Sequence, residues 1–120
     1  MLYIGFSTKT HKKFARIVCK YFRHCAPIIM YNDKYVLYQF VDRKNIIPIE
    51  IKPRDIQILV QHGWTFIKYN GKFDITIALK SKSMTCVQFT KNLCGIRNIT
   101  IQTPDGLFKK LNKKPVGYGG

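Results

Sequence analysis

Two periodicities of hydrophobic residues run along this chain, and they predict a mixture of strands and helices. Apolar residues that alternate with polar ones, or that form short β-branched and aromatic runs, are typical of strands. By this criterion we predict strands over 2–6, 24–30, 35–41, 45–51, 64–69, 73–79 and 97–102. Apolar residues that recur at helical spacing between capping signals predict helices. These segments are 9–22, 53–62, 84–94 and 104–111.

A tight turn at Asn32-Asp33 joins two of the predicted strands into an antiparallel hairpin. This turn places Ala26 opposite Gln39. Because alternate residues of a strand share a face, His24 and Gln39 are expected to be diagonal neighbours on one face. Shifting the turn by one residue would move Gln39 to the other face, which is the alternative register.

Proline and glycine mark three further boundaries. Asn70-Gly71 is a strong two-residue hairpin signal and predicts that strand 64–69 pairs with strand 73–79. Pro48 lies inside a predicted strand, which indicates an edge strand or a bulge. Thr103-Pro104 combines an N-cap with a first-turn proline and predicts the start of the last helix.

The segment from Ser83 to Gly95 has the signals of a helix with both ends marked. Ser83 is a good N-cap residue, and Gly95 suits the left-handed position after the last turn. Cys86 then falls about three residues into the helix, where unpaired N–H groups and the helix dipole favour a thiolate. A catalytic cysteine is one interpretation. A small buried apolar residue is the other, because the helical period places Cys86 on the packed face. Its companions on that face are Phe89, Thr90 and Leu93.

Charge is the most pronounced feature of the composition. The net charge is +15, from 21 lysines and arginines against 6 aspartates and glutamates. Such a balance implies attraction to a polyanion, which could be nucleic acid, an anionic cell-wall polymer or an acidic protein surface. A generally basic, solvated surface is the alternative.

Length and hydropathy predict one domain with a real core, since 46% of the 120 residues are hydrophobic. No apolar run reaches the roughly 18 residues that a membrane span needs. The N-terminal segment has neither a basic start nor a small-residue cleavage site, so we expect synthesis in the cytoplasm without a signal peptide.

The four cysteines are Cys19, Cys25, Cys86 and Cys94. No two of them form a C-x-x-C pair, and their spacing is not that of a zinc site. We therefore expect free thiols and no metal or other cofactor.

A cysteine nucleophile needs a base, usually a histidine, and a polar group that orients the base. His11 lies in the basic first helix and is expected to face water, and His62 lies at a helix end. His24 opens the hairpin, where the Gln39 amide can accept a hydrogen bond from one ring nitrogen and leave the other for a thiol. The alternative for His24 is a strand-end histidine whose ring is satisfied locally.

The order of histidine, polar residue and helix-borne cysteine resembles the circularly permuted papain-like proteins of the NlpC-type superfamily. The motifs that carry the resemblance are FRHCAPII at 22–29, YVLYQF at 35–40, TCVQFTK at 85–91 and TPDGLFKKL at 103–111. The resemblance extends from about Ile4 to Leu111. It departs from the family pattern at Arg23, where a small serine is usual, and at Gln39, where an acid is common.

The resemblance implies an α+β fold in which an antiparallel sheet packs against the helix that carries the nucleophile. The papain-like domain would be 1–111, followed by a basic, Gly/Pro-containing tail at 112–120. Cys86 would be the nucleophile, His24 the base and Gln39 the orienting residue of a cysteine amidohydrolase or peptidase. The implied substrate is the peptide stem of peptidoglycan, and the implied source is a small phage-encoded member of the group.

Two other functions remain open from the residues. The same fold could be a structural component of a phage virion, catalytically weak or inactive, that docks to an acidic protein or to packaged DNA. Plain nucleic-acid binding through basic and aromatic side chains, Trp64 among them, is the third, although no known nucleic-acid motif is present.

Overall fold

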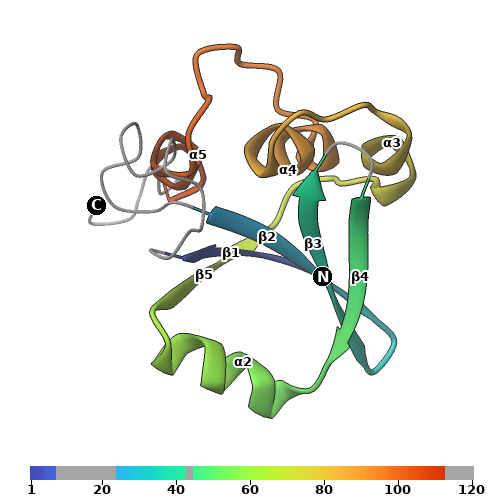
Figure 1. Cartoon of the computed structure of the whole chain (residues 1–120), viewed down its shortest axis with the longest axis vertical. Helices are drawn as coiled ribbons and strands as arrows, with labels where there is room; N and C mark the ends of the chain where they lie inside the picture. Colours follow the sequence, from blue (N-terminus) through green and yellow to red (C-terminus); the bar gives the residue numbers. More distant parts are fainter. Residues whose placement is uncertain (8–23, 43–44, 113–120) are drawn as a thin grey trace.

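Five antiparallel strands form the sheet around which the chain is organised, in the order β4-β3-β2-β1-β5 (Figure 1). The computed structural model describes residues 1–7, 24–42 and 45–112. The strands are β1 Leu2–Ser7, β2 His24–Tyr31, β3 Lys34–Asp42, β4 Asn45–Ile51 and β5 Trp64–Tyr69. The helices are α2 Pro53–Gln61, α3 Ile75–Lys80, α4 Cys86–Cys94 and α5 Pro104–Leu111. The predicted α+β class is confirmed.

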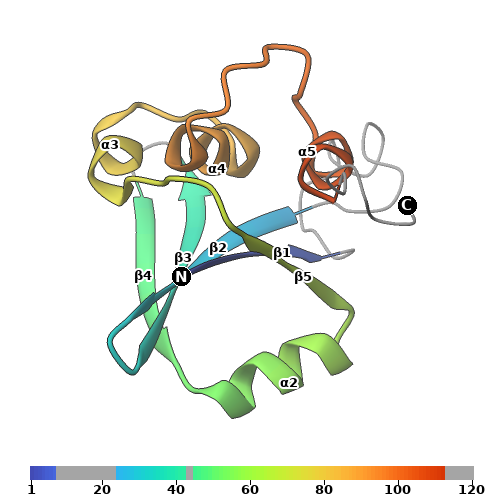
Figure 2. The ribbon, with the colours of Figure 1, turned by 180° about the vertical axis from the view of Figure 1, so that it is seen from behind.

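The sheet separates two hydrophobic clusters of unequal size. Helices α3, α4 and α5 lie on one side of the sheet, and α2 lies on the other (Figures 1 and 2). The larger cluster joins β1 and β3 to those three helices through Phe6, Phe40, Ala78, Phe89 and Leu107. The smaller cluster, with Ala26, Ile28 and Leu37 at its centre, lies under α2. Successive residues of β2 therefore face different cores.

The hairpin register follows the two-residue turn that the sequence predicts. Tyr31 pairs with Lys34 and Ile28 pairs with Leu37, which leaves Asn32 and Asp33 as the loop. Asn32 has a φ of 54°, the left-handed conformation that asparagine tolerates and such a turn requires. This register places Gln39 on the same face of the sheet as His24.

Strand β4 is an edge strand, as Pro48 predicted, because among the described strands it pairs only with β3. A proline has no N–H to donate to a ladder, so it is tolerated on an edge. The starts of α2 and α5 are also confirmed. Pro53 is the first residue of α2, and the Thr103 hydroxyl accepts a hydrogen bond from the Gly106 N–H at the start of α5.

The predicted strand over 73–79 is wrong, because most of this segment is helix α3. The Asp74 carboxylate accepts hydrogen bonds from the N–H groups of Thr76 and Ile77 and so caps the helix. The run Ile75-Thr76-Ile77 has high strand propensity, but a strand also needs a pairing partner, and here the N-cap interaction determines the structure.

The predicted strand over 97–102 is also wrong, since this segment is irregular. The Lys91 ammonium donates hydrogen bonds to the carbonyl oxygens of Asn98 and Ile101, at 2.7 and 2.8 Å. The Asn98 side chain accepts from the Thr100 N–H and hydroxyl. These hydrogen bonds engage backbone carbonyl and N–H groups that a strand would use to pair with its neighbour. The segment therefore forms a turn and not a strand.

Helix α4 begins two residues later than predicted. Thr85 is the N-cap, and its hydroxyl accepts a hydrogen bond from the Gln88 N–H at 3.0 Å. Ser83 is instead buried and accepts from the Asn92 side chain. Cys86 is consequently the first residue of the helix. The C-terminal prediction is confirmed, since Gly95 has a φ of 68°.

The predicted first helix at 9–22, with His11, Cys19 and Arg23 in or beside it, lies outside the described residues, as does nearly all of the 112–120 tail. Among the helices of the described part, none has the length and apolar character needed to cross a membrane.

Candidate active site

Cys86 is placed by helix α4 at the point where the helix packs over strand β2. As the first helical residue, it lies beside the N–H groups and the positive end of the dipole of α4. The Thr85 cap fixes this end of the helix. Cys86 as a residue is partly exposed, while the next turn of the same face is buried. The nucleophile candidate is therefore held by a packed helix and still has access to solvent.

The pKa of the Cys86 thiol lies well below its ordinary value. A hydrogen bond from the Cys25 side chain lowers it most, and burial acts in the opposite direction. A hydrogen bond and charge attraction from His24, together with a hydrogen bond from the Cys25 backbone, lower it further. Two consecutive residues at the start of β2 thus stabilise the Cys86 thiolate.

His24 is oriented by the residue that the hairpin register places on its face. The Gln39 amide nitrogen lies 3.0 Å from Nε2 of His24. This contact occupies Nε2 and leaves Nδ1 as the nitrogen available to Cys86. A half-turn of the amide would bring its oxygen to Nε2, where it accepts the proton that a doubly protonated ring carries. This second orientation is the one that suits a base at Nδ1, because a neutral ring that accepts from the amide nitrogen at Nε2 carries its own proton on Nδ1.

The ring of Trp64 packs against His24 from the neighbouring edge of the sheet. Their centroids are 5.9 Å apart at an interplanar angle of 86°, an edge-to-face arrangement. Trp64 also stacks on Phe66. Both aromatic rings lie over Gly5, where a Cβ atom would come within 2.6 Å of Phe66 and 2.9 Å of Trp64. The absence of a side chain at Gly5 is what admits these rings.

Replacing Gly5 with alanine should therefore displace Trp64 and, with it, the wall of the His24 site. We expect a loss of about 1–3 kcal/mol in the free energy of unfolding, the usual range for overpacking. Trp64 is the only tryptophan, so its fluorescence emission reports the displacement directly. Gly95→Ala is the matched control. Because Gly95 has a φ of 68°, its replacement by alanine should lower the free energy of unfolding by about 1 kcal/mol. A Cβ atom there meets no atom within 4 Å, so Trp64 should stay in place. Unchanged emission in Gly5→Ala would contradict the arrangement.

Cys25 is a second thiol at the site that the sequence did not single out. It is fully buried, and its Sγ lies 3.7 Å from the Thr90 hydroxyl. That hydroxyl donates a hydrogen bond to the Cys86 carbonyl at 2.9 Å. Hydrogen bonding with Cys86, followed by burial, raises the pKa of Cys25 well above its ordinary value. The pair therefore holds one thiol that ionises easily and one that does not.

The alternation of β2 was the signal that could have located Cys25. His24 and Cys25 are neighbours, so their side chains leave the strand on opposite faces, and the face of Cys25 is the one that α4 covers. Of the other histidines, His62 is the C-cap residue of α2, which lies on the opposite side of the sheet from α4. His11 lies outside the described residues.

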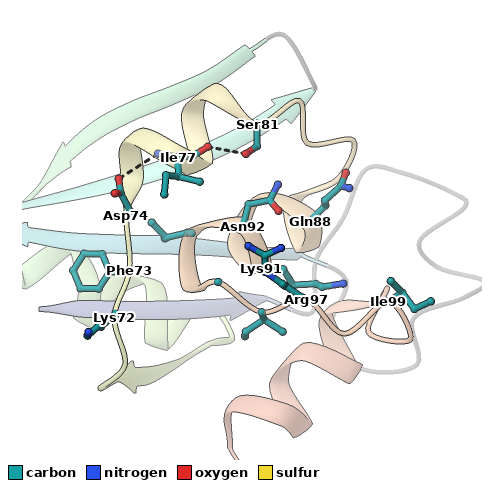
Figure 3. Close-up of a pocket in the computed structure, with 13 residues that line it drawn as sticks. Lys72, Phe73, Asp74, Ile77, Ser81, Gln88, Lys91, Asn92, Arg97 and Ile99 are labelled. Carbon is teal, nitrogen blue, oxygen red and sulfur yellow. Dashed lines mark hydrogen bonds between the residues drawn. The ribbon is translucent and has the colours of Figure 1, made fainter.

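The hollows in the described part of the chain differ in how near they lie to Gln39 and Trp64. One of about 710 Å³ lies between α3, α4 and the 95–99 segment, and it contains none of Cys86, His24 and Gln39 (Figure 3). A smaller and mostly apolar hollow of about 370 Å³ lies between the sheet and α2. Its lining includes both Gln39 and Trp64. The smaller hollow is the one that adjoins the His24 side of the site.

Within the described ranges, no three His, Cys, Asp or Glu side chains gather where they could hold a metal ion. Comparison of the chain with protein-family models, with curated proteins and with solved structures finds no match.

Proposed function

We propose that the protein is a cysteine hydrolase in which Cys86 is the nucleophile, His24 the base and Gln39 the group that orients the base. The observation that carries this proposal is the lowered pKa of the Cys86 thiol, to which His24 contributes while Gln39 contacts its ring. A buried structural cysteine would have its pKa raised, as Cys25 and Cys94 do. We extend the proposal to the fold, which we interpret as a permuted papain-like domain.

The chemistry would be acyl transfer to sulfur followed by hydrolysis. With the Gln39 amide oxygen turned to a protonated Nε2, Nδ1 of His24 takes the Cys86 proton, and the thiolate attacks the carbonyl carbon of an amide or ester. The backbone N–H groups at the start of α4 lie beside the sulfur and can stabilise the oxyanion that forms. The imidazolium returns the proton to the leaving group, and it then draws a proton from the water that releases the acyl group.

The substrate class follows from the resemblance noted in the sequence and from the charge of the protein. The net charge of +15 would attract the protein to an anionic cell wall. These features support the peptide stem of peptidoglycan as the substrate.

Acylation of Cys86 by an activated ester tests the nucleophile without knowledge of the natural substrate. p-Nitrophenyl acetate should give a burst of nitrophenolate and add one acetyl group to the Cys86 peptide, measured by mass spectrometry. Cys86→Ala should lose both signals, and Cys94→Ala should keep both, since Cys94 lies at the far end of the same helix. Solubilised peptidoglycan fragments then test the substrate through the appearance of new amino termini. An unacetylated Cys86 in the folded wild type would refute the hydrolase proposal.

A binding role is the second candidate, and the hollow of Figure 3 favours it. Lys72, Lys91 and Arg97 border this hollow. The carboxylate of Asp74, which also borders it, is engaged in capping α3. An acidic protein surface or a nucleic-acid backbone would complement such a surface. Docking of a virion component would use this face, which is separate from Cys86.

A further inference from the structure

The hydrolase proposal leaves one nucleophilic group at the site without a role, the buried thiol of Cys25. Cys25 and Cys86 belong to the same packed cluster, and the hydroxyl of Thr90 contacts both residues, at the Cys25 sulfur and at the Cys86 carbonyl. The Cys25 side chain is also the largest cause of the lowered pKa of Cys86, which agrees with their closeness. We propose that Cys86 and Cys25 form a redox-active pair that a peroxide converts into an intramolecular disulfide. This inference does not rest on the hydrolase activity.

The asymmetry of the pair fixes the order of the two steps. Cys86 is partly exposed and adjoins the N-terminus of α4, so it is the thiolate that an oxidant meets first. Cys25 is shielded from solvent on all sides and can react only with a group already inside the cluster. That group is the oxidised Cys86.

In the first step, the Cys86 thiolate attacks one oxygen of hydrogen peroxide. A sulfur–oxygen bond forms, the oxygen–oxygen bond breaks, and hydroxide leaves and takes up a proton as water. The sulfur becomes a sulfenic acid while the peroxide is reduced by two electrons. The negative charge that opposed ionisation of Cys25 is then gone, since the sulfenic acid is neutral.

In the second step, the Cys25 thiol loses its proton and its sulfur attacks the sulfenic sulfur of Cys86. The sulfur–sulfur bond forms, the sulfur–oxygen bond breaks, and the departing hydroxide leaves with that proton as water. Two thiols and one peroxide thus give one disulfide and two waters. A dithiol reductant reverses the bond by thiol–disulfide exchange. The disulfide protects Cys86 from irreversible oxidation to the sulfinic acid.

The positions of the described cysteines also explain why Cys25, and not Cys94, would form the disulfide with Cys86. Cys94 lies at the opposite end of α4, and a helix holds its two ends apart. The described cysteines Cys25, Cys86 and Cys94 are free thiols, as predicted. The disulfide is therefore a second state of the pair.

Titration of the full chain with one equivalent of hydrogen peroxide, followed by blocking of free thiols and peptide mapping, tests the proposal. The wild type should lose two hydrogens in mass, yield a Cys25–Cys86 linked peptide and regain both thiols with dithiothreitol. Cys25→Ser should accumulate a Cys86 sulfenic acid that dimedone labels, at least about tenfold more than in the wild type. Cys94→Ala is the matched control and should form the disulfide as the wild type does.

Two results would overturn the inference. One is a wild type whose Cys86 is labelled by dimedone, or converted to the sulfinic acid, as fast as in Cys25→Ser. The other is a disulfide that joins Cys86 to Cys19 or to a second molecule. Mapping of the wild type gives an answer even where Cys25→Ser fails to fold. Failure of ester acylation would refute the hydrolase and leave this result unaffected, because the readout is the bond itself.

Discussion

Replacing His24 with alanine should slow the alkylation of Cys86 by iodoacetamide about tenfold or more near neutral pH. The reactive species is the thiolate, and His24 stabilises that thiolate by a hydrogen bond and by charge. Without the imidazole, Cys86 keeps the hydrogen bonds from Cys25 and the N-terminus of α4. Reactivity should therefore fall strongly but stay above that of a buried thiol.

The pH dependence of the alkylation rate shows whether His24 acts on the ionisation of the Cys86 thiol or on the access of iodoacetamide to it. Because the pKa of wild-type Cys86 is lowered, its rate of alkylation should rise with pH before that of an ordinary thiol does. Removal of His24 raises this pKa, so the profile of His24→Ala should move to higher pH. Above the ordinary thiol pKa of about 8.5, both proteins increasingly carry the thiolate and the two rates should converge. A rate difference that persists unchanged at alkaline pH would mean that His24 controls access and is not the ion-pair partner.

Two matched measurements complete this test. Gln39→Ala should slow alkylation less than His24→Ala, because Gln39 acts on Cys86 only through the orientation of the ring. Cys94 serves as an internal control in every sample, since burial raises its pKa to about 12 and it should stay unlabelled at neutral pH. Added salt should reduce the effect of distant lysines and arginines and leave the His24 effect largely intact. Equal rates in wild type and His24→Ala at every pH would rule out a working dyad.

The parts of the site that depend on residues close together in the chain could be predicted from the sequence. A two-residue turn at Asn32-Asp33 fixes the hairpin register, and strand alternation then fixes which side chains share a face. These two rules predict that Gln39 lies beside His24, and the contact between their side chains confirms it. The helix that carries Cys86 was also predictable, because its apolar period and Gly95 are sequence-local signals.

What the sequence did not reveal depends on contacts between distant segments. Cys25 comes next to His24 in the chain, but its closeness to Cys86 arises only when α4 packs over β2. Likewise, the segment after Asn70-Gly71 has strand-forming residues, and the Asp74 cap makes it a helix in the absence of a pairing strand. Propensity describes a segment alone, whereas pairing and packing belong to the whole sheet.

Phe89→Ala should be the most destabilising single change at the site, because Phe89 anchors the helix that positions Cys86. The side chain is fully buried, and its ring centroid lies 6.4 Å from that of Phe40 on β3. Truncating such a residue removes the transfer free energy of the ring and leaves a cavity, which together cost about 3–5 kcal/mol. A domain of this size has a total stability of about 5–15 kcal/mol, so a large share would be lost.

Urea denaturation monitored by Trp64 fluorescence measures this loss as a lower midpoint with an unchanged slope. Ile99→Ala is the matched control, since Ile99 is 79% exposed and its truncation should change the free energy of unfolding by no more than about 0.5 kcal/mol. Phe89→Ala should also slow alkylation of Cys86 near neutral pH, because a loosened α4 no longer holds the sulfur against His24 and Cys25. A variant that lost stability but kept the full reactivity of Cys86 would show that the lowered thiol pKa does not depend on the packing of α4 over β2. The reactive thiolate would then originate in the first turn of the helix alone.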